Sequence, residues 1–328
     1  MGRMIGSSSI SFDKPPFIIE GASIVGQKEG DGPLGKLFDV VEQDPMLGQE
    51  TWEEAESLLQ KEAIQKLLFK AGMSKEEIRY IFGGDLLGQL IATTFGILEF
   101  EVPFFGLYGA CSTMGEALSL GAVMVEAGNA DNVIAMASSH FASAERQFRF
   151  PLAYGKQRPY AATWTVTGCG AVIISTKKGF AKITGITTGK IVDFGVKDAQ
   201  NMGACMAPAA ADVIYQHFKD FNSTPADYDK IITGDLGLIG KSILFELLKE
   251  KGYDISAVHM DCGVEMFDAS EQDTHAGGSG CGCSATVLAG YAFKKILFIP
   301  TGALMSPVSF NEGNSVPGIA HCVVIEKN

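Results

Sequence analysis

The chain has 328 residues, 46% of which are hydrophobic, and its formal net charge is −12 at pH 7. This length is enough for two domains or for one large α/β unit with an extensive core. A chain this acidic is a poor general binder of nucleic acid or of anionic lipid surfaces, although the total charge does not exclude a local cationic pocket.

The seven cysteines include no C-x-x-C pair, which indicates reduced thiols in a cytosol-like compartment. Cys281 and Cys283 have no second pair at zinc spacing, so we expect no metal site, and no fingerprint of a bound cofactor is present. The amino terminus lacks the apolar region of a signal peptide, and no apolar run reaches the length of a membrane span. We therefore expect no transmembrane segment, while peripheral attachment through a partner stays open.

The predicted elements fall into two similar series. In chain order, the first half contains an extended segment, a helix, a strand, a cysteine-containing turn that opens into a helix, and two strands, at 17–25, 50–71, 78–82, 109–114, 132–137 and 167–175. The second half contains the same series at 181–191, 203–219, 228–232, 277–285, 296–299 and 317–325. Each half therefore has the predicted order β-α-β-α-β-β.

An internal repeat supports this division. Residues 74–86 read SKEEIRYIFGGDL and residues 224–236 read TPADYDKIITGDL, and the two segments align without a gap. Each begins with Ser or Thr followed three residues later by Glu77 or Asp227, which is typical of a capping box. We expect one compact α/β unit of two pseudo-symmetric halves, residues 1–178 and 179–328, with mixed sheets packed in layers with helices.

Two such halves, with a cysteine at the second strand-to-helix turn of the first half, resemble the thiolase superfamily. In thiolases and β-ketoacyl-carrier-protein synthases this cysteine, here Cys111, is the acyl-accepting nucleophile. A helix amino terminus favours the thiolate, so a lowered pKa is expected for Cys111. The alternative is that Cys111 is an ordinary small buried residue.

The other catalytic residues of the superfamily do not match. Where the initiating synthases carry His-Gln-Ala-Asn, this chain has Gly-Asp-Leu-Gly at 234–237, and their Gly-Asn-Thr-Ser is replaced by Gly-Gly-Ser-Gly at 277–280. We therefore expect a binding protein rather than an enzyme. The alternative is an acyltransferase that uses Cys111 with an unrecognised base, such as His275 or His259.

Several residues are candidates for a ligand site. Asp85 and Asp235 end equivalent strands, where ligands of α/β sheets gather, although an Asp in this position also caps turns. His140 follows the strand at 132–137. The segment ERQFRFPLAYGKQR (145–158) gathers cations and aromatic rings suited to a flat carboxylate, or forms a solvated loop or part of a dimer interface; its members are Arg146, Phe148, Arg149, Phe150, Tyr154, Lys156 and Arg158.

The strings SSHFASAERQFRFP (138–151), GGSGCGCSA (277–285) and TGALMSP (301–307), with GGDLLGQ (83–89), are similar to the stage V sporulation protein AD family of spore-forming bacteria. This resemblance implies binding of dipicolinic acid (pyridine-2,6-dicarboxylate) or its calcium chelate, for uptake into the developing spore. It also implies a peripheral location at the spore inner membrane, with membrane proteins of the same sporulation operon as partners. We expect a homodimer, as in other thiolase relatives. The expected ligand-binding residues are Asp85, Cys111, Ser112, His140 and Arg149.

Overall fold

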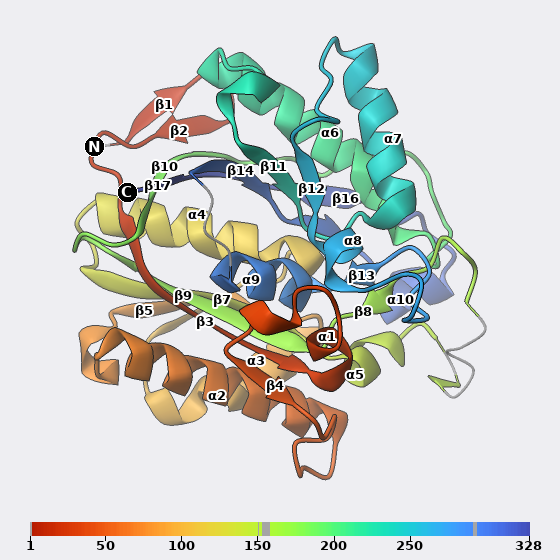
Figure 1. Cartoon of the computed structure of the whole chain (residues 1–328), viewed down its shortest axis with the longest axis horizontal. Helices are drawn as coiled ribbons and strands as arrows, with labels where there is room; N and C mark the ends of the chain where they lie inside the picture. Colours follow the sequence, from red (N-terminus) through yellow and green to blue (C-terminus); the bar gives the residue numbers. More distant parts are fainter. Residues whose placement is uncertain (1, 150, 153–157, 291–293) are drawn as a thin grey trace.

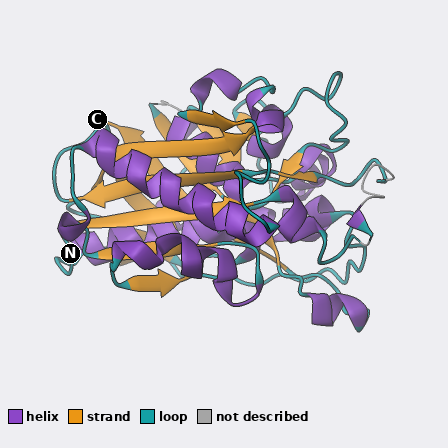
Figure 2. Cartoon of the chain, turned by 90° about the horizontal axis from the view of Figure 1, so that it is seen from below, coloured by secondary structure: helices purple, strands orange, loops and turns teal. Residues whose placement is uncertain are grey.

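The computed structural model describes residues 2–149, 151–152, 158–290 and 294–328. The elements form five layers that alternate between helices and strands from top to bottom of Figure 1. The upper layer contains α6 (Met202–Phe221) and α7 (Gly237–Glu250), the middle layer α4 (Thr113–Glu126) and α9 (Cys281–Gly290), and the lower layer α2 (Trp52–Ala71) and α3 (Ile91–Ile97). Figure 2, seen from the α2 side, shows helices lying across the strands.

The two layers of strands repeat one order. From the centre outward the first runs β3 (Phe17–Gly26), β9 (Gly168–Ser175), β7 (Asn132–Ser139), β5 (Tyr80–Gly84) and β6 (Phe104–Gly106). The second runs β10 (Ala181–Thr187), β17 (Cys322–Lys327), β14 (Lys295–Ile299), β11 (Lys230–Thr233) and β12 (His259–Asp261). Short antiparallel pairing of β3 with β10 joins them, at Ile18–Ala181 and Phe17–Lys182. The predicted pseudo-symmetry is thus confirmed, and the expected division after residue 178 falls in the connection between β9 and β10.

The capping boxes predicted at the two repeats are present. The Glu77 carboxylate accepts a hydrogen bond from the Ser74 amide at 3.0 Å, and the Asp227 carboxylate accepts one from the Thr224 amide at 2.7 Å. Both boxes close a turn of 3₁₀-helix that leads directly into a buried strand, β5 or β11. The local sequence therefore determines where the chain enters the equivalent strand of each half.

Each half also contains a helix and a strand that the predicted order omits. They are α3 with β6 in the first half and α7 with β12 in the second, and they place an additional parallel strand at each outer edge. Both strands are short, with three residues each.

Alternating residues of the strands face different layers. In β14, Phe298 packs into the core around the middle helices, whereas Leu297 packs into the core beneath α6. In β7, Ala135 faces the middle helices and Ile134 faces α2. The period of two along each strand therefore buries both faces of both sheets, which explains why these strands are almost continuously apolar.

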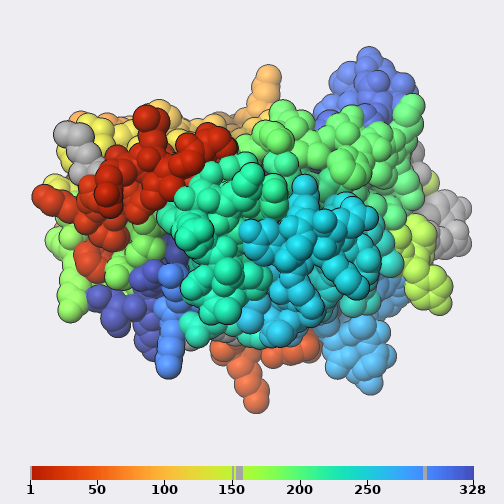
Figure 3. Space-filling view, turned by 90° about the horizontal axis from the view of Figure 1, so that it is seen from above, coloured from red at the N-terminus to blue at the C-terminus, as the bar shows by residue number. Residues whose placement is uncertain are grey.

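Smaller elements complete the structure. The hairpin of β1 (Arg3–Ile5) and β2 (Ser9–Ser11) lies beside the end of α6, where the Asp220 carboxylate accepts a hydrogen bond from the Ser9 hydroxyl at 2.8 Å. Figure 3 shows this red amino-terminal segment next to the teal-green region of α6. Of the helices in the described ranges, none is long and apolar enough to cross a bilayer.

We predict that Gly170→Ala destabilises the protein by about 1–3 kcal/mol, the usual cost of overpacking a core. A Cβ atom at this position in β9 would lie 2.2 Å from the carbonyl carbon and oxygen of Ala285 in α9, so the helix would have to move off the sheet. Gly88→Ala is the matched control, because nothing lies within 4 Å of its added carbon. Urea denaturation followed by circular dichroism measures both variants, and equal stabilities would contradict this account of the packing.

Candidate functional site

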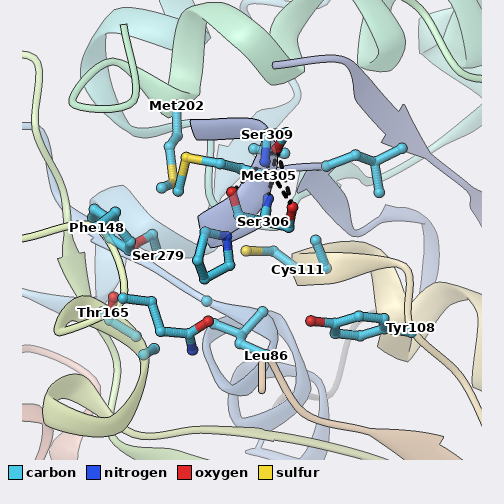
Figure 4. A pocket seen from close by; sticks show the side chains of 17 residues that line it. Leu86, Tyr108, Cys111, Phe148, Thr165, Met202, Ser279, Met305, Ser306 and Ser309 are labelled. Atoms are coloured by element: carbon cyan, nitrogen blue, oxygen red, sulfur yellow. Dashed lines mark hydrogen bonds between the residues drawn. The ribbon is translucent and has the colours of Figure 1, made fainter. Parts of the chain in front are cut away.

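A cavity of about 280 Å³ opens where the two halves meet, with Cys111 at its floor. Figure 4 shows Tyr108 and Leu86 on one side of the cavity and Met202, Met305 and Ser306 on the other. Residues from both halves line it: Leu86, Tyr108, Ala110, Cys111, Ala144, Gln147, Phe148, Thr165, Met202, Ser279, Gly280, Ala303, Leu304, Met305, Ser306, Pro307 and Ser309. We call this cavity the Cys111 pocket.

The turn that carries Cys111 is held in an uncommon conformation. Residues Ala110–Ser112 form a single 3₁₀ turn before α4, and Ala110 has φ = 51°, in the left-handed region that non-glycine residues rarely adopt. The backbone of Gly302 packs directly on this turn, since a Cβ atom there would lie 2.5 Å from the Gly109 carbonyl oxygen. The second half therefore fixes the position of Cys111 through β15 (Thr301–Ala303).

The Asp235 carboxyl is a neighbour of the Cys111 thiol. It follows β11 and is buried, and its oxygens accept hydrogen bonds from the Thr301 hydroxyl at 2.7 Å and from the Gly280 amide at 2.9 Å. The neighbouring Cys111 thiol also lowers the pKa of this carboxyl. Burial outweighs these bonds and raises the pKa of Asp235 to about 7, so near neutral pH it exchanges between its two protonation states.

The prediction of a lowered pKa for Cys111 is wrong. Burial raises the pKa of this thiol well above its ordinary value, and the neighbouring Asp235 carboxyl raises it further. The Gly280 amide lowers the pKa of this thiol, but by less than burial and Asp235 raise it. A thiol with a raised pKa is protonated near neutral pH, and in this state Cys111 is a weak hydrogen-bond donor.

Asp85, the pseudo-equivalent of Asp235, closes its own turn. Its carboxylate accepts hydrogen bonds from the amide of Leu87 at 2.7 Å, and from the amide and hydroxyl of Thr93 at 2.7 and 2.6 Å. It is fully buried and is not among the residues that line the Cys111 pocket; the adjacent Leu86 is. Of the two alternatives considered for Asp85, the structure shows the capping interaction.

Ser112 and His140 also make local contacts outside the lining of the pocket. The Ser112 hydroxyl donates to the Gly109 carbonyl at 2.7 Å. His140 accepts a hydrogen bond at Nδ1 from the Ala142 amide at 3.2 Å, so Nε2 donates to the Pro45 carbonyl at 2.8 Å. His140 thereby caps the short helix α5 (Phe141–Glu145), and burial lowers its pKa.

Arg149 lies beside the pocket. It forms a buried ion pair with Glu145 at 2.8 Å and donates to the side-chain oxygen of Gln200 at 3.3 Å. It borders a narrow space that shares Phe148, Thr165, Met202 and Ser279 with the Cys111 pocket. Of the five expected ligand residues, Cys111 thus lines the pocket, Arg149 adjoins it, and Asp85, Ser112 and His140 do not line it.

The rest of the predicted cationic segment is dispersed. Arg146 pairs with Glu53, and the guanidinium of Arg158 lies over the Trp164 ring at 4.7 Å. Phe148 lines the pocket, whereas Phe150, Tyr154 and Lys156 lie outside the described residues.

Sequence reasoning placed Asp85 ahead of Asp235 as a ligand residue. In the structure it is Asp235 whose carboxyl neighbours the Cys111 thiol, and Met202 lines the pocket. The sequence contained one signal for Asp235, since it stands where the initiating synthases carry their histidine motif. It contained no signal for Tyr108, Ser279 or Ser306, whose position depends on how the two halves meet.

None of the chain's five histidines is found among the described residues that line the pocket. His259 contacts the Thr233 hydroxyl at 2.9 Å, and burial lowers its pKa to about 3. His275 pairs with Asp273 at 2.9 Å. Neither residue is therefore placed to take a proton from Cys111. Among the described side chains, no cluster of three or more metal-ligating residues occurs.

We predict that the protein loses stability between about pH 6.5 and pH 8, because at lower pH the buried histidines His217 and His259, whose pKa burial lowers to about 3, have the opposite effect. Burial raises the pKa of Glu56 to about 8, with a further contribution from the charge of Asp85, and burial raises the pKa values of Glu29 and Asp235 to about 7. In this range the folded chain binds more protons than the unfolded chain, so the free energy of unfolding falls as the pH rises, by up to about 1.4 kcal/mol per pH unit for each group.

Thermal denaturation in buffers from pH 6.5 to 8.5 tests this prediction. Glu56→Gln removes one of the titrating groups and should reduce the fall in melting temperature, even if the variant is less stable at pH 6.5. A melting temperature that is constant or rises over this range would contradict the assignment.

Comparisons with known proteins agree with this geometry. The model of the family described as Stage V sporulation protein AD (SpoVAD) matches residues 6–326. Stage V sporulation protein AD of Bacillus subtilis (strain 168) is 42% identical over 333 residues, covering 99% of this chain and 98% of that protein.

Similar solved structures include 3-oxoacyl-[acyl-carrier-protein] synthase III from Aquifex aeolicus VF5, with a TM-score of 0.56 and 15% identity over 95% of this chain and 99% of the other. OleA from Xanthomonas campestris, crystallised with lauric acid and lauroyl-CoA, has a TM-score of 0.57 and 13% identity over 97% of this chain and 99% of the other. At this identity the likeness concerns the fold alone, and it confirms the expected thiolase-like architecture.

Proposed function

Because the chain belongs to the stage V sporulation protein AD family, we propose that it binds dipicolinic acid, or its calcium chelate, in the Cys111 pocket for uptake into the developing spore. The observation that supports this proposal best is a cavity that contains Cys111, the residue matching the nucleophile of the superfamily, with no histidine among the described lining residues. Its volume, about 280 Å³, is at the low end for ligand pockets and suits one substituted aromatic ring.

The lining is chemically suited to a flat ring that carries polar groups. Tyr108, Phe148 and Met305 offer apolar and aromatic surface, while the hydroxyls of Thr165 and Ser279 are hydrogen-bond donors for carboxylates. No cationic side chain occurs among the lining residues within the described ranges, and Arg149 is next to them. A ligand that arrives as its calcium chelate brings its own cation, which compensates for this lack.

We predict that dipicolinate stabilises the protein, by about 2.7 kcal/mol when its concentration is a hundredfold above Kd. Cys111→Ala should weaken binding roughly 3- to 10-fold, which corresponds to the loss of one hydrogen-bond donor. Thermal shift and isothermal titration calorimetry, each with and without calcium, measure both effects. Cys322→Ala is the matched control, because Cys322 is equally buried but lies in β17 outside the pocket. Absence of any binding in either condition would refute the proposal.

We also infer that Cys111 performs no acyl transfer, which leaves the acyltransferase alternative without support from the geometry. The thiol is protonated because burial raises its pKa, and no histidine among the described residues lines the pocket to remove the proton.

Incubation with acetyl-CoA and longer acyl thioesters should therefore leave the Cys111 peptide unmodified in mass spectrometry, while an authentic 3-oxoacyl synthase treated in parallel becomes acylated. An adduct on Cys111 with the mass of the acyl group would contradict this inference and support the acyltransferase alternative.

We propose that two copies of the chain associate through the β6 edge. Phe105 in this strand and Tyr108 just after it are 44% and 53% exposed, whereas the pseudo-equivalent edge strand β12 is fully buried. An exposed apolar edge strand is a template for pairing with a second chain. Because Tyr108 also lines the pocket, a second copy at this edge would lie next to the ligand.

Sedimentation velocity should show a dimer that Phe105→Asp converts to a monomer. Ile239→Asp, which places the same charge at an exposed position in α7, should leave the dimer intact. A monomeric wild-type protein would refute this interface. We further propose that the dimer lies at the spore inner membrane with membrane proteins of the same operon as partners, which the family membership supports.

A further inference from the structure

The turn between β5 and α3 contains two consecutive residues in a backbone conformation that side chains disfavour. Gln89 has φ = 58° and Leu90 has φ = 55°, both in the left-handed region. For non-glycine residues this region is a local strain, and it persists only where the surrounding structure imposes it. We call residues 85–93 the Asp85 turn.

The Asp85 carboxylate imposes this conformation by drawing the two ends of the turn together. It accepts one hydrogen bond from the Leu87 amide at 2.7 Å, and two from Thr93, from the amide at 2.7 Å and from the hydroxyl at 2.6 Å. Asp85, Leu87 and Thr93 are all buried. Water therefore does not compete for these bonds, and loss of one donor leaves a buried acceptor short of a partner.

The Thr93 hydroxyl has a fixed direction. The side-chain amide of Gln60, buried in α2, donates to the Thr93 oxygen at 3.0 Å and to the Ser138 hydroxyl of β7 at 2.6 Å. An amide nitrogen only donates, so the Thr93 oxygen is the acceptor of that bond and its own hydrogen goes to Asp85. Helix α2 and strand β7 thus hold the Asp85 turn through one threonine.

The Asp85 turn also carries part of the wall of the Cys111 pocket. Leu86 lines the cavity beside Tyr108, and Figure 4 shows these two side chains on one side of it, across from Met202. The position of this wall therefore depends on the backbone of the turn and on the segment that follows β6.

Leu90 connects these two parts of the wall. Its side chain occupies the space that glycine leaves at the ends of β5 and β6. A Cβ atom added at Gly84 would lie 3.1 Å from the Leu90 Cδ2, and one added at Gly106 would lie 2.8 Å from the Leu90 Cδ1. The strained residue thus packs against the strand end from which Tyr108 follows, so one turn supports both Leu86 and Tyr108.

We propose that Thr93 is a positioning residue for ligand binding: through Asp85 it keeps the strained turn closed and holds Leu86 and Tyr108 in place before the ligand arrives. This inference rests on the proposed function, because it assumes a ligand in the Cys111 pocket. A wall that is formed in advance removes an ordering cost from the binding step. If the wall is formed in only a fraction of the molecules, the affinity falls by that fraction.

Isothermal titration and stopped-flow fluorescence with dipicolinate test the proposal on the full chain. Thr93→Val keeps the shape of the side chain but removes the hydroxyl, and it should bind dipicolinate about 3- to 10-fold more weakly, as expected for one lost hydrogen bond. The association rate should fall and the dissociation rate should stay near that of the wild type. A purely structural role would lower the melting temperature without changing the association rate.

Two variants serve as controls for Thr93→Val. Thr93→Ser restores the hydroxyl and should return the affinity and the association rate to those of the wild type. Thr94→Val makes the same change at the next position, which is exposed, and should leave both unchanged.

Gln89→Gly tests the strain by itself. Glycine adopts the left-handed region without steric cost, and Gln89 is exposed, so this variant should melt about 1–3 °C above the wild-type protein. A lower melting temperature would contradict the presence of strain in the turn.

The outcomes separate this inference from the proposed function. Wild-type affinity and association rate in Thr93→Val overturn the positioning role and leave the binding function standing. Absence of dipicolinate binding by the wild-type protein overturns the proposed function, and the inference with it. If Thr93→Val does not fold, hydrogen exchange of the wild-type protein decides the matter. The amides of Leu87 and Thr93 should be protected without ligand, and protection that arises only with dipicolinate would overturn the preformed wall.

Discussion

The close packing of α9 against β9 is the constraint on which the site depends. Gly170 has no side chain, so the backbone of α9 at Ala285 can lie directly on the sheet of the first half. This contact brings the beginning of α9, with Gly280 and Cys281, to the carboxyl ends of the first-half strands. The turn of Cys111 reaches the second half in the same way, since Gly302 allows its backbone to approach. Each half therefore supplies the floor or wall of a pocket that neither half contains alone.

The two halves use equivalent residues for different purposes. Asp85 satisfies its oxygens with the turn that follows its own strand, at Leu87 and Thr93. Asp235 instead binds Gly280 and Thr301 and reaches Cys111 in the other half. Cys281, at the beginning of α9, is fully buried, and its thiol donates to the Ser138 carbonyl at 2.8 Å.

Burial of acidic groups gives this chain an electrostatic character that its total charge does not show. Glu29, Glu56 and Asp235 are held in the interior, where desolvation favours the protonated form and raises their pKa values into the neutral range. A typical acyl-transfer site needs the opposite, a thiolate beside a base. Here burial raises the pKa of the Cys111 thiol, and no histidine occurs among the described residues that line the pocket.

The sequence by itself determined the elements whose signals are local. The capping boxes at Ser74 and Thr224, the apolar strands that follow them and the turn of Cys111 all depend on neighbouring residues, so the repeat, the layered α/β fold and the place of Cys111 were predictable. The tertiary structure alone decided which aspartate meets Cys111, because that depends on contacts between β11, α9 and β15, which are far apart in the chain. It also decided the pKa of the thiol, since desolvation by the surrounding layers outweighs the effect of the helix terminus that the sequence reveals.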